Sequence, residues 1–182
     1  VELAAKRLGK DGFEDYDGHF WGFLETRPYM RARGRLAETL RFAGRMDDAI
    51  AEWEGMLNLN PDDNQGVRYE LLAAYLEQSN LDGAKHLFSQ YDECNSNAVF
   101  AWCKVLACYL DGDKTAASKA LGAARKQNPH VEGFLTRRKR LPKQLPAHYS
   151  MGSKEEAVCF ADTLFQTWGV HPNAEKWLAS SA

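Results

Sequence analysis

Residues 35–63 read RLAETLRFAGRMDDAIAEWEGMLNLNPDD. Apolar residues recur at helical spacing on both sides of Gly44, which predicts two amphipathic helices joined by a short turn. The small residues Ala37 and Ala49 let two antiparallel helices approach closely, and Gly44 ends the first helix. Pro61 stops the second helix. The stretch therefore predicts a helical hairpin.

The same pattern returns twice at a spacing of about 34 residues, which indicates an internal repeat. In the second repeat, apolar and small residues at the matching offsets are Leu71, Leu72, Tyr75, Ala84 and Phe88. In the third repeat they are Trp102, Val105, Leu106, Tyr109, Ala117, Leu121 and Ala124, followed by Pro129. The second repeat departs from the pattern at two positions, because Ser79 replaces the turn glycine and Ser96 the terminal proline.

These motifs resemble the tetratricopeptide repeat. The resemblance implies an all-α fold, a tetratricopeptide-type helical-hairpin solenoid with capping helices at both ends. A generic helical bundle with irregular helices is the alternative. Two flanking stretches, ETRPYMRARGRLAETL (25–40) and YSMGSKEEAVCFADTLFQTWGVHPNAEKWL (149–178), are similar to a group of bacterial tetratricopeptide proteins of uncharacterised function.

The chain is expected to have four parts. Residues 1–29 form an N-terminal capping helix and loop, in which Thr26 starts the next helix before Pro28. Three repeats occupy 30–131, at about 30–64, 65–98 and 99–131. A basic, proline-containing linker covers 132–152. Residues 153–182 form a C-terminal helical pair, a degenerate repeat or cap, whose first helix has Ser153 as its N-cap.

The composition is that of an ordinary soluble chain. Its 182 residues have a formal charge of -2 and are 45% hydrophobic, which argues against a globally basic nucleic-acid coat. No apolar run is long enough to cross a bilayer, and the start lacks the features of a secretory signal. Four cysteines without a C-x-x-C pair are typical of reduced thiols. We expect a cytoplasmic protein without membrane contact, and the initial valine suggests a fragment of a longer chain.

Catalytic and metal-binding patterns are missing from the sequence. The five histidines occur singly, without the H-E-x-x-H pattern of a zinc site. The chain has neither the phosphate-binding G-x-x-x-x-G-K-[ST] motif nor a G-x-S-x-G nucleophile motif. We therefore expect no enzyme activity, no cofactor and no metal.

The resemblance instead implies a binding groove for a protein or peptide partner. In tetratricopeptide proteins the first helix of each repeat lines a concave face. Carrying the groove positions over to this chain gives Arg31, Arg35, Glu38, Arg41, Tyr69, Glu70, Phe100 and Lys104. Guanidinium groups bind carboxylates with two parallel hydrogen bonds, so the arginines suit an acidic segment. The alternative for them is a solvated face paired with neighbouring acids such as Glu25 and Glu38.

A second cluster of positive charge lies in the linker, at Arg137, Arg138, Lys139, Arg140 and Lys143. It suggests an alternative function, a nucleic-acid-binding adaptor. No stacking aromatics interleave the run, so a solvated linker is favoured and nucleic acid is disfavoured as a partner. An enzyme accessory subunit is the third possibility.

Overall fold

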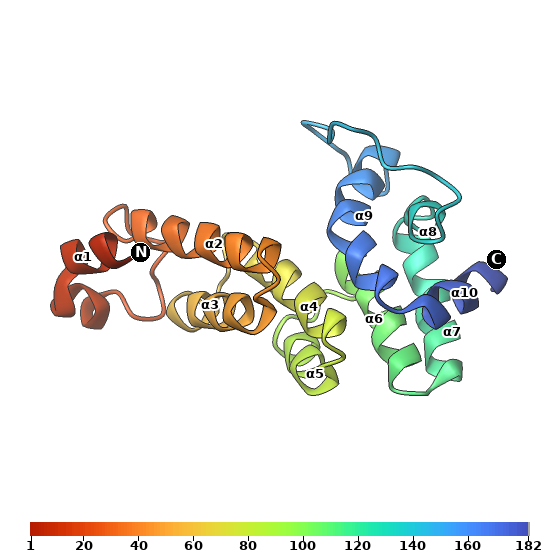
Figure 1. Ribbon diagram of the computed structural model, residues 1–182, viewed down its shortest axis with the longest axis horizontal. Helices are drawn as coiled ribbons and strands as arrows, with labels where there is room; N and C mark the ends of the chain where they lie inside the picture. The colour runs from red at the N-terminus through yellow and green to blue at the C-terminus, as the bar shows by residue number, and fades with distance from the viewer. Residues whose placement is uncertain (182) are drawn as a thin grey trace. The chain divides into compact units, whose positions relative to one another are not determined.

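The computed structural model describes residues 1–181, and over that range helices are its only regular secondary structure (Figure 1). This confirms the all-α prediction. Contacts divide the chain into two compact units, an N-terminal unit of Val1–Leu71 and a C-terminal unit from Leu72 onward. The division falls inside α4 (Val67–Glu77). No helix in the described part is long and apolar enough to span a membrane.

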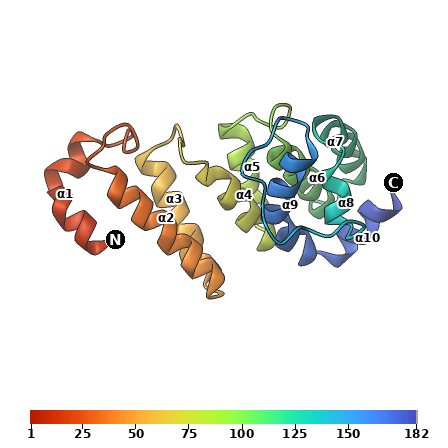
Figure 2. The same ribbon diagram turned by 90° about the horizontal axis from the view of Figure 1, so that it is seen from above.

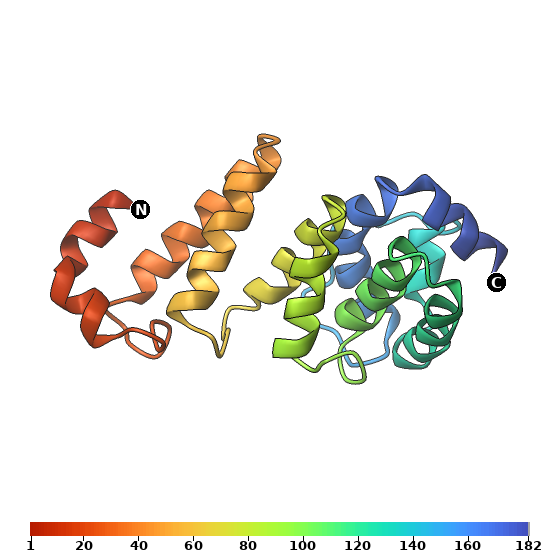
Figure 3. The ribbon, with the colours of Figure 1, turned by 90° about the horizontal axis from the view of Figure 1, so that it is seen from below.

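The N-terminal unit contains α1 (Glu2–Asp15), α2 (Arg27–Phe42) and α3 (Met46–Leu59). Figure 3 shows α2 and α3, in orange, side by side up to their shared turn. Their facing surfaces bury Ala37, Ala49 and Trp53, each at most 2% exposed. The small side chains permit the close approach that the sequence predicts.

The start of α2 is also as predicted, because Thr26 is its N-cap and a proline occupies its first turn. The Thr26 hydroxyl donates to the carbonyl oxygens of Phe20 and Phe23, which secures the preceding loop. The N-terminal helix α1 continues to Asp15 across a kink at Gly9, whose φ of 70° is readily adopted by a glycine.

The C-terminal unit contains α5 (Leu81–Gln90), α6 (Ala98–Leu110), α7 (Lys114–Gln127), α8 (Val131–Leu135), α9 (Lys154–Gly169) and α10 (Pro172–Ser180). Its centre is α6, which contacts α5, α7, α9 and α10. Nine of its thirteen residues are buried, because apolar side chains cover nearly its whole circumference. Ser153 is the N-cap of α9 and accepts a hydrogen bond from the Glu156 N–H, as predicted.

The turns after α2, α4 and α6 have the same length and the same backbone geometry. Each contains three residues, and the middle residue has a positive φ: Gly44 at 76°, Ser79 at 56° and Gly112 at 84°. In each turn, the N–H of the third residue donates to the carbonyl oxygen five positions earlier, as from Arg45 to Leu40. The N–H of the middle residue donates to the carbonyl oxygen three positions earlier. These are the paired bonds of a Schellman C-cap. Ser79 thus adopts the glycine conformation.

The segment between α8 and α9 is an extended loop (Figure 2). It is joined to the rest of the C-terminal unit by a buried polar contact. The fully buried Asn128 amide donates to the Ser153 carbonyl at 2.9 Å and to the Glu156 carboxylate at 2.8 Å. The same carboxylate accepts from the Gly152 N–H at 2.7 Å. These bonds satisfy groups that would otherwise be buried without partners.

Candidate protein-binding surface

The arginines of α2 have different environments. Arg41 forms an ion pair with Glu70, with Nη1 and Oε2 2.7 Å apart, so these two expected groove residues bind each other. The Arg31 guanidinium lies over the Trp21 ring, 5.5 Å from its centroid, and Arg27 lies over the same ring at 5.3 Å. Cation–π contacts hold these two cations beside the loop that precedes α2.

Arg35 remains available to a ligand. Its side chain is exposed and makes no ion pair with any described residue. It borders a hollow of about 540 Å³ between the start of α1 and α2, whose lining includes Glu2, Leu3, Leu36 and Thr39. A cation beside a partly apolar hollow suits a ligand that has both a carboxylate and an apolar group.

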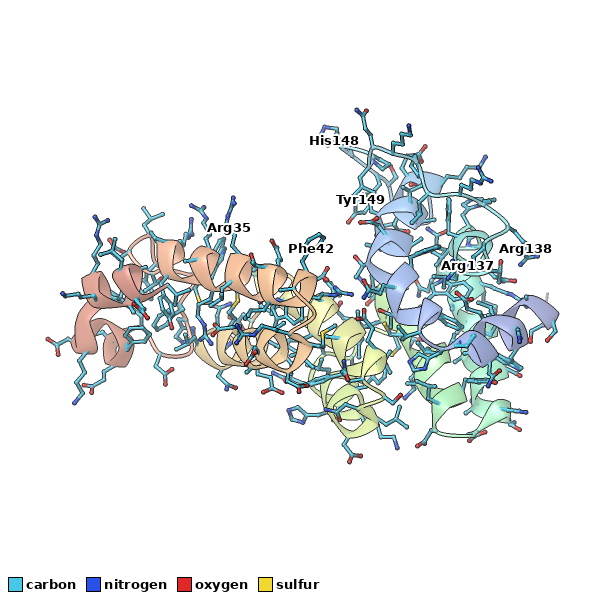
Figure 4. All side chains as sticks on the ribbon, viewed as in Figure 1. Arg35, Phe42, Arg137, Arg138, His148 and Tyr149 are labelled. Carbon is cyan, nitrogen blue, oxygen red and sulfur yellow. The ribbon has the colours of Figure 1, made fainter. Side chains whose placement is uncertain are left out.

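Phe42 lies on the same stripe of α2 and is 96% exposed. Arg35, Glu38 and Phe42 recur at intervals of three and four residues, which places them on one face of the helix. Figure 4 shows Arg35 and Phe42 projecting from the same side of α2. A rise of 1.5 Å per residue puts them about 10 Å apart along the helix axis. Phe42 is not among the groove residues predicted from the sequence, although its spacing from Arg35 and Glu38 could have identified it.

The other expected groove residues are largely engaged by their neighbours. The Arg68 guanidinium lies 4.4 Å from the Tyr69 ring centroid and donates to its hydroxyl at 2.7 Å. Phe100 is fully buried and packs edge-on against Phe88, so it belongs to the hydrophobic core. The Lys104 ammonium lies 4.7 Å from the Phe88 ring centroid and is partly exposed.

Much of the basic cluster in the linker is paired. Arg137 contacts the Glu175 carboxylate at 3.2 Å, and Arg138 contacts the Glu132 carboxylate at 2.7 Å. Lys139 lies over the Phe134 ring at 5.7 Å. Arg137 and Arg138 lie close to α8 and α10, whereas His148 and Tyr149 lie on the extended loop (Figure 4). Lys139, Arg140 and Lys143 are exposed and have no ion pair with a described residue.

Within residues 1–181, no group of three His, Cys, Asp or Glu side chains is placed to hold a metal ion. Burial raises the pKa of the Cys94, Cys108 and Cys159 thiols above their ordinary value, which disfavours the nucleophilic thiolate.

Comparison of the chain with protein-family models, curated proteins and solved structures gives no match.

Proposed function

We propose that this chain is a tetratricopeptide-type solenoid that acts as a scaffold or adaptor by binding a protein segment, in the bacterial cytoplasm and without catalysis of its own. The repeat assignment is supported by the turn residues Gly44, Ser79 and Gly112, which are 35 and 33 residues apart and share one geometry. A fully buried alanine follows each of them by five positions, at Ala49, Ala84 and Ala117. Equivalent small residues at equivalent places in three hairpins are expected of a repeat.

The observation that carries the binding proposal is the stripe of Arg35, Glu38 and Phe42 on α2. A phenylalanine with 96% of its surface in water stabilises nothing in the isolated fold. Aromatic and arginine side chains dominate the energetics of protein interfaces. An aromatic side chain and an unpaired guanidinium two helical turns apart therefore form a two-point recognition site.

The proposed partner is an extended or helical segment with an acidic and an apolar side chain. Its carboxylate would pair with Arg35, while its apolar group would cover Phe42 or enter the hollow beside Leu3 and Leu36. Phe42 supplies the apolar contact area, and Arg35 sets the orientation. A nucleic-acid-binding adaptor is less favoured, because Arg137 and Arg138 already contact carboxylates.

Selection from a random peptide library tests the proposal although the natural partner is unidentified. The immobilised full chain should enrich peptides that combine Asp or Glu with a large apolar residue. Binding of these peptides should fall at least about tenfold with Arg35→Glu plus Phe42→Ala, which replaces attraction with repulsion and removes the aromatic contact.

The matched control is Lys143→Glu plus Leu145→Ala, which changes an exposed cation and an exposed apolar residue of the linker in the same way. Both double variants alter the net charge equally. Enrichment of such peptides with equal loss in the two variants would indicate general charge attraction and contradict the α2 site. Failure to enrich any peptide class would contradict the binding function itself.

A further inference from the structure

A second surface of the molecule, separate from the α2 stripe, has the form of a small-molecule site. It is a pocket of about 270 Å³ in the C-terminal unit, between α6, α7 and the loop that precedes α6. We propose that this pocket binds a small amphipathic carboxylate, a molecule with an apolar body and one acidic group. This inference goes beyond the proposed function and does not depend on it.

The walls of the pocket are apolar. Ala101 and Cys108 come from α6, Ala116 and Ala120 from α7, and Cys94 from the loop. The small side chains of these alanines leave the space between the loop and the surfaces of α6 and α7 unfilled. Burial raises the pKa of both thiols, so Cys94 and Cys108 are neutral wall groups at neutral pH.

The rim of the pocket carries two lysines, Lys104 from α6 and Lys119 from α7. Neither forms an ion pair with a residue in the described part of the chain. The ring of Phe88 holds the Lys104 ammonium at 4.7 Å from its centroid, which limits where this charge can lie. Two lysines that line an apolar pocket and have no ion pair with a described residue favour an anionic head group.

No Asp or Glu is among the described residues that line the pocket, but acidic side chains lie near it. Burial chiefly raises the pKa of the Cys94 thiol, and the nearby Asp92 carboxylate adds to this effect. Asp111 accepts from Lys85 at 3.0 Å, and Asp113 accepts from the Ala116 N–H at 2.8 Å as the N-cap of α7. The Gln127 amide donates to the carbonyl of Asn95, which is one of the lining residues. The charged side chains that line the pocket itself are therefore those of Lys104 and Lys119.

The volume sets the size of the apolar body. A dry cavity of about 150 Å³ accepts benzene. A pocket of about 270 Å³ therefore accommodates roughly eight to ten carbon atoms. Octanoate has this size and charge, and it is the probe for the experiment. Its carboxylate would lie between Lys104 and Lys119, and its chain along the alanines of α7.

The two wall thiols provide the readout. The full chain is incubated with N-ethylmaleimide at increasing octanoate concentrations, and mass spectrometry measures the modification rate of each cysteine. Octanoate should slow the modification of Cys94 and Cys108 about tenfold at saturation while leaving Cys159 unchanged. Cys159 does not line the pocket and serves as the internal reference. Octanol, which lacks the charge, should require a concentration about tenfold higher.

Two sets of variants test the pocket itself. Lys104→Met with Lys119→Met should raise the half-protecting octanoate concentration about tenfold, whereas Lys114→Met with Lys126→Met, which removes equal charge outside the pocket lining, should not. Ala120→Phe should abolish protection by filling the space, with Ala123→Leu as a milder replacement if helicity falls.

Several outcomes would overturn the proposal. One is that millimolar octanoate does not slow the modification of Cys94 and Cys108. Another is that it slows the modification of Cys159 equally. A third is that both lysine-pair variants raise the half-protecting octanoate concentration to the same extent. If octanol protects the two thiols as strongly as octanoate does, the pocket does not recognise a carboxylate and the proposal is wrong on that point. Protection by library-selected peptides alone would make the pocket a protein contact and contradict a small-molecule site.

Discussion

Ser79 holds a backbone conformation that glycine holds in the two related turns. Its φ of 56° places its side chain against the following carbonyl group, a cost that Gly44 and Gly112 avoid. The turn still forms, because the hydrogen bonds from Ser79 to Leu76 and from Asn80 to Tyr75 satisfy the carbonyls at the end of α4. The side-chain oxygen of Asn80 then caps α5 by accepting from Gly83 at 2.9 Å.

Replacing Ser79 by glycine should therefore stabilise the protein. The change relieves the left-handed strain but gives the unfolded chain more freedom, so we expect a net gain of about 0.5–1 kcal/mol. Urea unfolding measures it. Gly44→Ala is the reverse experiment and should destabilise by about 1 kcal/mol, because its new Cβ meets no atom within 4 Å and the cost comes from φ alone. A loss of stability in Ser79→Gly would contradict the shared turn geometry.

The half-buried thiols of Cys94 and Cys108 should react with alkylating agents more slowly at neutral pH than the thiol of a free cysteine peptide. Burial raises the pKa of Cys94 and Cys108, so the thiolate forms at a higher pH than in a free cysteine peptide. The pKa shift is upward because burial disfavours the charged thiolate form. A plot of the iodoacetamide rate against pH should have its midpoint above that of the peptide. A midpoint below it would show that the ammonium of Lys104 outweighs desolvation.

At the level of the elements, the three second helices of the hairpins share one feature. Ala49 on α3, Ala84 on α5 and Ala117 on α7 are all fully buried, where a larger side chain has no room. In the proposed repeat, these alanines allow the two helices of each hairpin to approach closely.

Substituting tryptophan at each of these alanines should destabilise the protein strongly and to a similar extent. Overpacking costs about 1–3 kcal/mol, and a change this large should reach the top of that range or exceed it. Thermal unfolding followed by circular dichroism measures the effect. Gly122→Trp on the exposed face of α7 is the control, since a Cβ there meets no atom within 4 Å. A surface-like response at Ala84 or Ala117 would restrict the repeat to the first hairpin.

The elements that sequence reasoning predicted well have local signals. The N-caps Thr26 and Ser153, the turn at Gly44 and the end of α3 before Pro61 follow from residues within one helical turn. The features that it missed depend on packing. Phe100 is fully buried and Phe42 is almost fully exposed, because the neighbouring helices cover different faces of α6 and α2. The pocket brings together Cys94, Cys108 and Ala120 from three segments, which no local pattern connects.

For the molecule as a whole, charge bears on the choice between a peptide and a nucleic acid. The chain has a formal charge of -2. Two cations of its basic cluster, Arg137 and Arg138, form ion pairs with Glu175 and Glu132. Nucleic-acid binders instead present clustered, uncompensated cations.

Generic duplex and single-stranded DNA should therefore show no useful binding at physiological salt, as measured by fluorescence anisotropy. The variant pair Arg140→Ala and Lys143→Ala removes two of the exposed cations of the cluster that have no ion pair with a described residue. If duplex DNA does bind, the slope of log affinity against log salt concentration is compared between the wild type and this variant pair. A decrease of about two in the magnitude of that slope would show that both side chains contact phosphates, and it would contradict peptide binding as the function.

We propose that Arg35 on α2 receives a carboxylate from a bound protein segment. A double-mutant cycle tests this pairing with a library-selected peptide, by crossing Arg35→Gln in the protein with Glu→Gln or Asp→Asn in the peptide and measuring affinities by calorimetry. We expect a coupling free energy of at least about 1 kcal/mol for this pair. The same peptide change crossed with Lys143→Gln should give a coupling free energy of about zero. A coupling free energy near zero at Arg35 for every acidic position of the peptide would contradict the proposed pairing.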